Sequence, residues 1–278
     1  MQCKGFFELI RVGNCVMAGF AAIIGSGIAY AQVSVEISIF GMIIIFTCVF
    51  LITGAGNAIN DFFDADIDAI NKPMRPIPSG RVSRNLALYF SLLLFGTGIA
   101  LSCLLNMICF VVAAINSALL IIYARNLKRT MLVGNICVGY LTGSTFLFGG
   151  ALFGMPGIIR TAGLFVLSML ATIAREIAKD IEDTSGDLAM GAATLPILVG
   201  RKRAGYVASA VGMFAVLLSP LPYFTGFSIW YLLVVGFADL CFLIAILRLI
   251  RGDAAGSSRS LKQAMVVALA AFVAGAWM

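Results

Sequence analysis

The sequence predicts an all-α membrane protein, a bundle of about nine transmembrane helices that forms a single domain over residues 1–278. Three observations lead to this prediction. First, 61% of the residues are hydrophobic and only 12% are charged, about half the charged fraction of a typical soluble domain. Second, apolar segments of about 20 residues, the length that crosses a bilayer as a helix, recur along the whole chain. Third, these segments lack the period-2 alternation of a membrane β-barrel.

The hydropathy pattern divides the chain into nine spans. The first, which begins at Val12, is too long for the apolar part of a signal peptide and lacks a cleavage signature, so we expect it to remain as a span. The third and fourth spans are separated by Asn106 alone. No interval between spans is long enough for a soluble domain. The predicted spans are residues 12–32, 37–60, 85–105, 107–123, 132–153, 158–179, 204–222, 227–249 and 262–278.

Basic residues gather on one side of the predicted membrane. With nine spans, the N-terminus shares its side with the connections near 61–84, 124–131, 180–203 and 250–261. That side then holds every Lys and Arg except Arg160. The positive-inside rule assigns it to the cytoplasm. Topology and attraction to anionic lipid heads account for the net charge of +6, so no nucleic-acid partner is needed. We therefore expect a multi-pass protein of the cell membrane.

A first acidic cluster lies at the predicted cytoplasmic end of the second span. Asn60, Asp64 and Asp68 are spaced i, i+4 and i+8, which places them on one face of a helix. Asp61 is near enough to join them, whereas Asp66 points to roughly the opposite side. Like charges at this spacing repel one another. Something positive is therefore expected to compensate them.

A second acidic cluster lies at the corresponding end of the sixth span. Glu176, Asp180, Asp183 and Asp187 again form one helical stripe, and Glu182 falls off it. Solvated helix ends would be the plain explanation for either stripe alone. Acids at the C-terminal end of a helix oppose its macrodipole, however, so stability alone does not explain two such stripes.

The two stripes and the cations beside them predict a site for Mg²⁺ and a di- or triphosphate. Mg²⁺ prefers oxygen ligands and combines one or two carboxylates with substrate phosphates. Lysines and arginines flank both stripes, as a phosphate site requires. The apolar interior would then accept a hydrocarbon chain. The chain has no histidine, which excludes His-based catalysis and ordinary zinc sites.

These residues resemble the motifs of the UbiA superfamily of intramembrane prenyltransferases, and the resemblance extends along essentially the whole chain. Within this superfamily, the chain is most similar to the archaeal branch that acts on glyceryl phosphate lipids. Stretches that carry this similarity include "GNAINDFFDADIDAINKPMRPIPSGRVS" and "REIAKDIEDTSGDLAMGAATLPILVG". Val12 follows Arg11 where many relatives have Pro in an RPxN pattern, while Asn14 is kept. The motif NDxxDxxxD corresponds to Asn60, Asp61, Asp64 and Asp68, the motif DxxxD to Asp183 and Asp187 after Asp180, and the Tyr-then-basic loop to Tyr123, Lys128 and Arg129.

The resemblance implies a Mg²⁺-dependent transfer of a geranylgeranyl group. The donor would be geranylgeranyl pyrophosphate, the acceptor the sn-2 hydroxyl of geranylgeranylglyceryl phosphate, and the leaving group pyrophosphate. Predicted catalytic residues are Asp64, Asp68, Asp183 and Asp187, which would hold Mg²⁺ together with Asn60, Asp61 and Asp180. Predicted substrate-binding residues are Lys72, Tyr123, Lys128, Arg129 and Lys179 near the pyrophosphate, Arg11, Arg75, Arg201 and Lys202 for the phosphate of the acceptor, and Asn14.

Several alternatives stay open at this point. The acceptor of a UbiA-type enzyme could instead be an aromatic acid, a naphthoate or haem. A cation or phosphate transporter is an alternative of another class, although transport sites usually lie near the bilayer midplane. The group that takes the acceptor proton is either a carboxylate of the second stripe or the departing pyrophosphate. Asp239, in the middle of the eighth span, either supports the site or accepts a structural hydrogen bond. The oligomeric state is not predicted.

Overall fold

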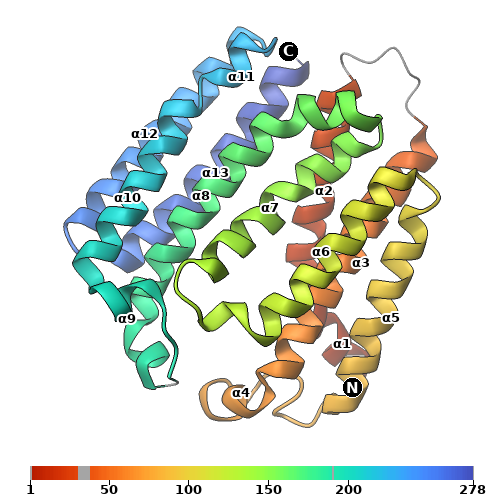
Figure 1. Cartoon of the computed structure of the whole chain (residues 1–278), viewed down its shortest axis with the longest axis vertical. Coiled ribbons are helices and arrows are strands. Elements are labelled where there is room, and N and C mark those ends of the chain that lie inside the picture. Colours follow the sequence, from red (N-terminus) through yellow and green to blue (C-terminus); the bar gives the residue numbers. More distant parts are fainter. Residues whose placement is uncertain (1, 31–37, 190, 278) are drawn as a thin grey trace. The chain divides into compact units, whose positions relative to one another are not determined.

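The structure, a computed structural model, describes residues 2–30, 38–189 and 191–277. Within these residues, eight helices are long and apolar enough to cross a membrane, so the predicted all-α, multi-pass architecture is confirmed (Figure 1). These eight are α2 (Val12–Tyr30), α3 (Ile39–Phe63), α5 (Arg84–Ser102), α6 (Met107–Arg125), α8 (Gly154–Ala189), α10 (Arg201–Leu218), α12 (Ile229–Ile250) and α13 (Ala254–Trp277).

The remaining predicted span, the fifth, 132–153, forms helix α7 (Val133–Ala151). It is as long as α2, but it is not among the eight helices that are apolar enough over their length to count as membrane spans. Residues 31–32, 37 and 278, at the ends of three predicted spans, lie outside the described residues. The shorter helices are α1 (Gln2–Ile10), α4 (Ala65–Asn71), the 3₁₀ turn η1 (Leu127–Arg129), α9 (Leu195–Val199) and α11 (Leu221–Phe224).

Asn106 lies between the third and fourth spans, but α5 ends at Ser102, so residues 103–106 rather than Asn106 alone separate the two helices. Asn106 is the N-cap of α6, and its side-chain oxygen accepts a hydrogen bond from the Cys109 amide at 2.9 Å. Such a cap satisfies one of the amides that a helix start leaves unpaired. The Asn106 amide group also donates to the Ala151 carbonyl at 2.9 Å, at the end of α7. One polar residue thus begins one helix and fixes the end of another.

The last span begins earlier than predicted. The segment 250–261 was expected to connect the last two spans, yet α13 already starts at Ala254. Asp253 explains the difference, since its carboxylate accepts a hydrogen bond from the Gly256 amide at 2.8 Å. Capping at this position starts the helix before the apolar segment is reached.

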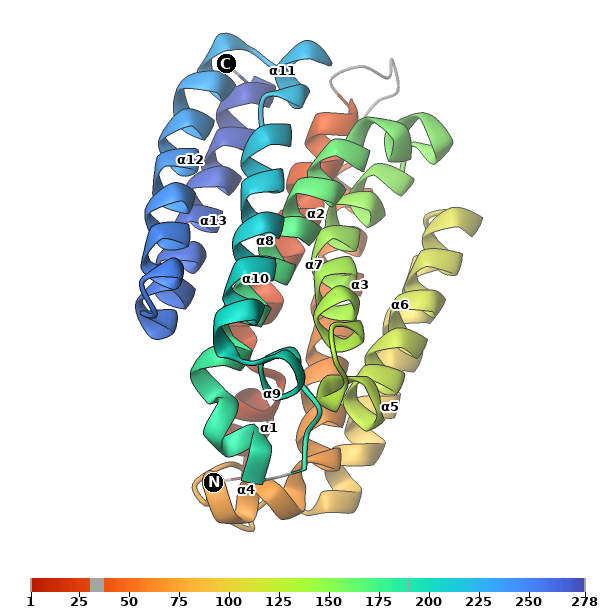
Figure 2. The same ribbon diagram turned by 60° about the vertical axis from the view of Figure 1, so that its left-hand side comes forward.

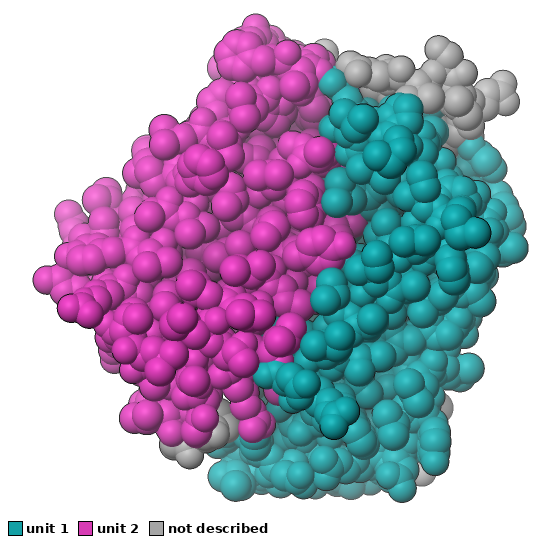
Figure 3. Space-filling model, in the orientation of Figure 1, with its two compact units in different colours: residues 1–126, 145–160 teal, residues 127–144, 161–278 magenta. Residues whose placement is uncertain are grey.

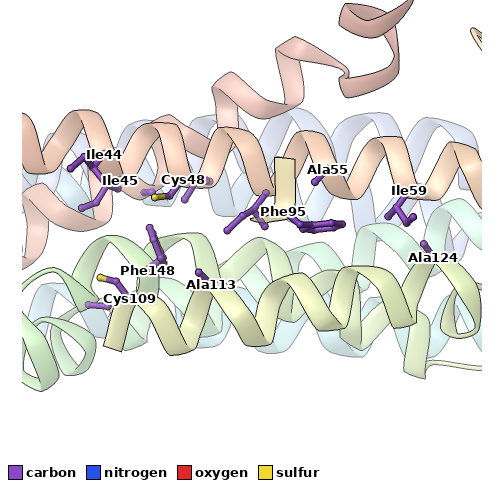
Figure 4. Packing of buried hydrophobic residues seen from close by; sticks show 14 residues of the cluster. Ile44, Ile45, Cys48, Ala55, Ile59, Phe95, Cys109, Ala113, Ala124 and Phe148 are labelled. Atoms are coloured by element: carbon purple, nitrogen blue, oxygen red, sulfur yellow. The ribbon is translucent and has the colours of Figure 1, made fainter. Parts of the chain in front are cut away.

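The chain forms two compact units, coloured separately in Figure 3: unit 1 comprises residues 1–126 and 145–160, and unit 2 residues 127–144 and 161–278. The core of unit 1 is centred on α3, which packs against α2, α5 and α6. Figure 4 shows side chains of α3, among them Cys48, pointing toward Cys109 and Ala113 of α6. The core of unit 2 joins α8, α10, α12 and α13. The single domain expected from the sequence stays a prediction.

Asp239 of α12 takes part in a hydrogen-bonded cluster within unit 2. The Ser219 hydroxyl donates to the Asp239 carboxylate at 2.6 Å, and the Tyr231 hydroxyl donates to the Ser219 carbonyl at 2.5 Å. Tyr231 is fully buried. Ser219 follows the last residue of α10, at the opposite end of that helix from Arg201. The sequence left two roles open for Asp239, support of the active site or a structural hydrogen bond, and these contacts favour the structural hydrogen bond.

We expect Asp239→Leu to lower the stability of the protein by about 1–2 kcal/mol, because the buried Ser219 hydroxyl loses its acceptor. Asp239→Asn is the matched control, since its amide oxygen still accepts the bond. Thermal unfolding of the purified protein in detergent measures both. Equal melting temperatures for the two variants would contradict the structural role.

Candidate active site

The first acidic stripe lies where α3 passes into α4, at the end of unit 1 that also holds α1 (Figure 2). The predicted continuous helix is interrupted: α3 ends at Phe63, and Asp64 has φ −88° and ψ 0° before α4 begins. These dihedrals lie outside the α-helical region. The amides of Asp64 and Asp68 nevertheless bond to carbonyls four residues earlier, at 3.0 and 2.8 Å. The spacing of the acids therefore stays close to helical across the joint.

The stripe divides into two pairs of side chains. The Asn60 amide group donates to the Asp64 carboxylate at 3.0 Å. Asp61 and Asp68 are instead both contacted by Nη1 of Arg75, which lies 3.2 Å from Asp61 Oδ1 and also pairs with Asp68 Oδ2. Asp61 and Asp68 are 4% and 5% exposed. The compensating charge that the sequence required is therefore supplied by Arg75.

Arg11 is the second cation at Asp61. It lies at the corner between α1 and α2 with φ 53°, a left-handed conformation that is uncommon for a residue other than glycine. Its Nη2 donates to Asp61 Oδ1 at 2.6 Å. Asn57 of α3 fixes the same corner, because its amide group donates to the Ile10 carbonyl at 2.8 Å. The Arg11 guanidinium is thus held at the acidic end of α3.

Cations and acids of unit 1 meet in a pocket of about 360 Å³. Arg11, Lys72 and Arg75, all predicted to bind substrate, line it together. Asp66 lies apart, as predicted from the helical spacing. Its side chain is 81% exposed and pairs with Arg84 at 3.1 Å. The other lining residues of the pocket are Glu8, Asp61, Pro73, Met74 and Pro76.

The segment that carries Lys72 and Arg75 is held by Arg81. The Arg81 guanidinium pairs with Glu8 of α1 at 2.6 Å and donates to the Met74 carbonyl at 2.6 Å. Val82 is 2% exposed and packs with Leu9 of α1. The Arg81 ion pair and the apolar contacts of Val82 therefore attach this segment to α1. Because the segment forms one wall of the pocket, these contacts also hold that wall in place.

The second acidic stripe lies on α8 in unit 2. This helix is 36 residues long and continues beyond the predicted span to Ala189, so the stripe lies on one continuous helix, as predicted. Asp180 is half-buried and accepts a hydrogen bond from the Asn135 side chain of α7 at 2.8 Å. Asp183 is exposed and Asp187 half-buried. Asn135 was not among the predicted residues, although an Asn inside an apolar span is a signal that could have identified it.

The predicted phosphate-binding cations of unit 2 lie at several positions. The Ala193 amide donates to the Arg129 carbonyl at 2.9 Å. This bond ties the segment after the second stripe to the basic turn η1. Two more of the predicted substrate-binding side chains are half-buried: Lys128 of unit 2 and Tyr123 at the end of α6 in unit 1. Others are exposed, namely Asn14 of α2 in unit 1 and Arg129, Lys179, Arg201 and Lys202 of unit 2.

The oxygen-rich side chains fit Mg²⁺ in the way that this ion usually binds. Within residues 2–30, 38–189 and 191–277, no three Asp, Glu or Cys side chains form a group that could hold a metal ion alone. Mg²⁺ rarely needs such a cage, because substrate phosphates and water complete its octahedron. The Asn60–Asp64 pair offers an amide oxygen and a carboxylate side by side. This donor set suits Mg²⁺ and would suit a softer metal poorly.

Comparison with known proteins identifies the family. The profile of the UbiA prenyltransferase family matches residues 18–272. A digeranylgeranylglyceryl phosphate synthase from Methanococcoides burtonii is 54% identical over 98% of this chain and 100% of its own length. A solved structure of a digeranylgeranylglyceryl phosphate synthase superposes with a TM-score of 0.86 at 41% identity, over 99% of this chain and 98% of the other.

A more distant structure shares the fold. It is a UbiA homologue from Archaeoglobus fulgidus bound to DMAPP and Mg²⁺, with a TM-score of 0.70 at 14% identity over 95% of this chain and 99% of the other. Motifs, architecture and full-length similarity thus agree. The chain is a multi-pass membrane protein and belongs to the UbiA prenyltransferase family.

Proposed function

We propose that the protein transfers a geranylgeranyl group from geranylgeranyl pyrophosphate to the sn-2 hydroxyl of geranylgeranylglyceryl phosphate, in archaeal ether-lipid synthesis. The observation that carries this proposal is the 54% identity, over essentially both full lengths, to a digeranylgeranylglyceryl phosphate synthase. The arginine-lined pocket of unit 1 supports it, because the acceptor bears a phosphate. Membership of a prenyltransferase family leaves the transporter alternative without support.

Asn60, Asp61, Asp64 and Asp68 of the first stripe, and Asp180, Asp183 and Asp187 of the second, would hold Mg²⁺. Their oxygen ligands support this assignment, as does the Mg²⁺ bound by the Archaeoglobus fulgidus homologue. When bound, Mg²⁺ supplies positive charge for the pyrophosphate as the allylic C–O bond breaks. Asp180, held by Asn135, lies one turn before Asp183 and would support the same stripe.

The cations of the chain bind the two phosphate groups of the reaction. Lys128 and Arg129 contact the pyrophosphate of the donor, with Tyr123 as a hydroxyl donor. Arg11 and Arg75 bind the phosphate of the acceptor, because the guanidinium group donates two parallel hydrogen bonds to a phosphate, whereas Lys72 contacts the pyrophosphate. The apolar spans surround the prenyl chains and keep water from the allylic carbon, which would otherwise be hydrolysed.

We also propose that the active site faces the cytoplasm and that one domain carries the activity. The segments that bear both acidic stripes are rich in Lys and Arg, which supports a cytoplasmic location. The family profile matches residues 18–272. Its range includes parts of both compact units, which supports a single domain.

Turnover assays with different acceptors test the proposal. Purified protein in detergent with Mg²⁺ and geranylgeranyl pyrophosphate is supplied with geranylgeranylglyceryl phosphate, with an aromatic acid or with a naphthoate. We expect a diether product from the lipid phosphate alone, identified by mass spectrometry, together with stoichiometric pyrophosphate. Turnover of an aromatic acceptor in place of the lipid phosphate would overturn the proposal. Retained turnover after the Mg²⁺ is removed with EDTA would overturn the metal assignment.

A further inference from the structure

We propose that Glu176 of α8 takes the proton of the sn-2 hydroxyl, and that Arg175 holds Glu176 for this step and donates to the acceptor. The proposal rests on the proposed function, since it assigns a role in that reaction. The hydroxyl oxygen bonds to the allylic C1 atom, the C1–O bond to pyrophosphate breaks with its electron pair, and the proton passes to the Glu176 carboxylate. Glu176 then releases this proton to water.

The location of the two residues is the first argument. Both lie within the sixth predicted span, residues 158–179, where an unpaired charge is costly and an ionisable residue usually has a function. Their neighbours Ile173 and Ile177 are buried in the core of unit 2. The side chains of Arg175 and Glu176 are nevertheless 27% and 16% exposed. The pair is therefore accessible to a ligand although the helix around it is packed.

The geometry of the pair is the second argument. Nη1 of Arg175 donates to Oε1 of Glu176 at 2.7 Å. Neighbouring residues of a helix point about 100° apart and do not face each other, so the Arg175 side chain must bend around the helix to make this contact. The contact keeps the Glu176 carboxylate ionised and fixes its direction. A proton acceptor requires both.

Unfilled hydrogen-bond donors beside the pair are the third argument. In the part of the chain that the structure describes, the buried Arg175 Nε group and the buried Thr172 hydroxyl, one turn earlier, have no hydrogen-bond partner. A Thr in a helix often bonds to a carbonyl of the preceding turn, as Thr184 of the same helix does at 3.0 and 2.8 Å. Buried donors without a partner cost free energy. The glycerol oxygens of the acceptor would supply these partners.

The position of Glu176 relative to the metal ligands is the fourth argument. Glu176 precedes Asp183 by seven residues of one continuous helix, about 10 Å along its axis. The C1 atom joins the pyrophosphate to the prenyl chain and so lies on the apolar side of the phosphates, the side of Asp183 on which Glu176 lies. Carboxylates that hold Mg²⁺ are weak proton acceptors, because the cation stabilises their ionised form. Glu176 is outside the metal set, and the exposed Glu182 lies off the stripe.

Glu176→Gln tests the proton transfer. Its amide oxygen still accepts a hydrogen bond from the hydroxyl but cannot take the proton, so we expect kcat for diether formation to fall by about 10²-fold or more. The KM for the acceptor and the Mg²⁺ concentration for half-maximal rate should each change by less than about twofold. Glu182→Gln is the matched control on the same helix and should change none of the three quantities.

Arg175→Lys tests the positioning role. Lys keeps the charge but lacks the planar fork, so it cannot hold Glu176 and donate to the acceptor together. We expect the KM for geranylgeranylglyceryl phosphate to rise by about tenfold, with an unchanged Mg²⁺ requirement. Titration of this lipid into purified protein in EDTA, which does not depend on turnover, should show weaker binding for Arg175→Lys and wild-type binding for Glu176→Gln. Wild-type binding by Arg175→Lys would contradict its role.

Thermal unfolding shows whether Glu176→Gln is folded. If it is not, Glu176→Asp takes its place, because it keeps the charge beside Arg175 and withdraws the carboxylate by one methylene group. We expect this shift to lower kcat by about tenfold or more, since a misplacement of about 1 Å is sufficient for such a loss.

Two results would contradict the role of Glu176. One is a wild-type kcat for Glu176→Gln, or for Glu176→Asp where the Gln variant does not fold, which would leave the departing pyrophosphate as the proton acceptor. The other is a raised Mg²⁺ requirement together with the loss of kcat, which would make Glu176 part of the metal site. Failure of the wild-type protein to use this acceptor would instead count against the proposed function, so the two failures are distinguishable.

Discussion

Asp64→Asn and Asp183→Asn will each reduce the rate of geranylgeranyl transfer by about 10³-fold, the effect expected when a group that stabilises transition-state charge is removed. One carboxylate lies at the joint of α3 and α4, the other on the exposed part of α8. Neither is fully buried, so an amide of the same size leaves packing intact. Initial rates of diether formation at saturating substrates measure the loss, and thermal unfolding confirms that each variant is folded.

Matched controls exist beside both stripes. Asp66→Asn and Glu182→Gln make the same chemical change on exposed side chains that lie off the predicted faces. We expect both to retain the wild-type rate within about twofold, in keeping with the small effects of surface substitutions. An equal loss in the controls would show that the total acidity of these segments matters rather than specific carboxylates. Full activity of Asp64→Asn or Asp183→Asn would remove that residue from the metal site.

The sequence predicted the features that depend on local periodicity. Helical spacing separated Asp66 from its neighbours in the first stripe, and the exposed Asp66–Arg84 pair agrees with that separation. Apolar length located the spans, although the third ends at Ser102, so that residues 103–106 and not Asn106 alone separate it from the fourth. These features follow from the chain within one or two helical turns, where the helix period fixes which side chains lie together.

The features that it missed depend on distant contacts. The pairing of Arg11 with Asp61 joins residues 50 positions apart, and the bond from Asn135 to Asp180 joins residues 45 positions apart. Periodicity within one segment contains no information about either contact. The early start of α13 was missed for another reason: the cap at Asp253 outweighs the loop-like composition of the segment that follows it. The interruption at Asp64 likewise has no marker such as Pro or Gly beside it.

Gly149→Ala is the second substitution with a large expected effect, this time on stability. Gly149 lies in the part of α7 that belongs to unit 1, and a Cβ atom there would lie 2.0 Å from the Ala22 carbonyl oxygen of α2. The two helices already share a hydrogen bond, from the Ser26 side-chain hydroxyl to the Gly149 carbonyl at 3.0 Å. Small residues permit such close approach between helices in membranes. Because the clash is with backbone, α2 and α7 must separate.

We expect this separation to cost about 3 kcal/mol, which corresponds to a fall in melting temperature of roughly 6–12 °C. Gly96→Ala on α5 of the same unit is the matched control, since a Cβ atom there meets nothing within 4 Å. Ala favours a helix over Gly by up to about 1 kcal/mol, so this variant should melt at the wild-type temperature or slightly above. Heating in detergent followed by size-exclusion chromatography measures both. Similar melting temperatures for the two variants would mean that α2 and α7 do not approach as closely as the hydrogen bond of Ser26 requires.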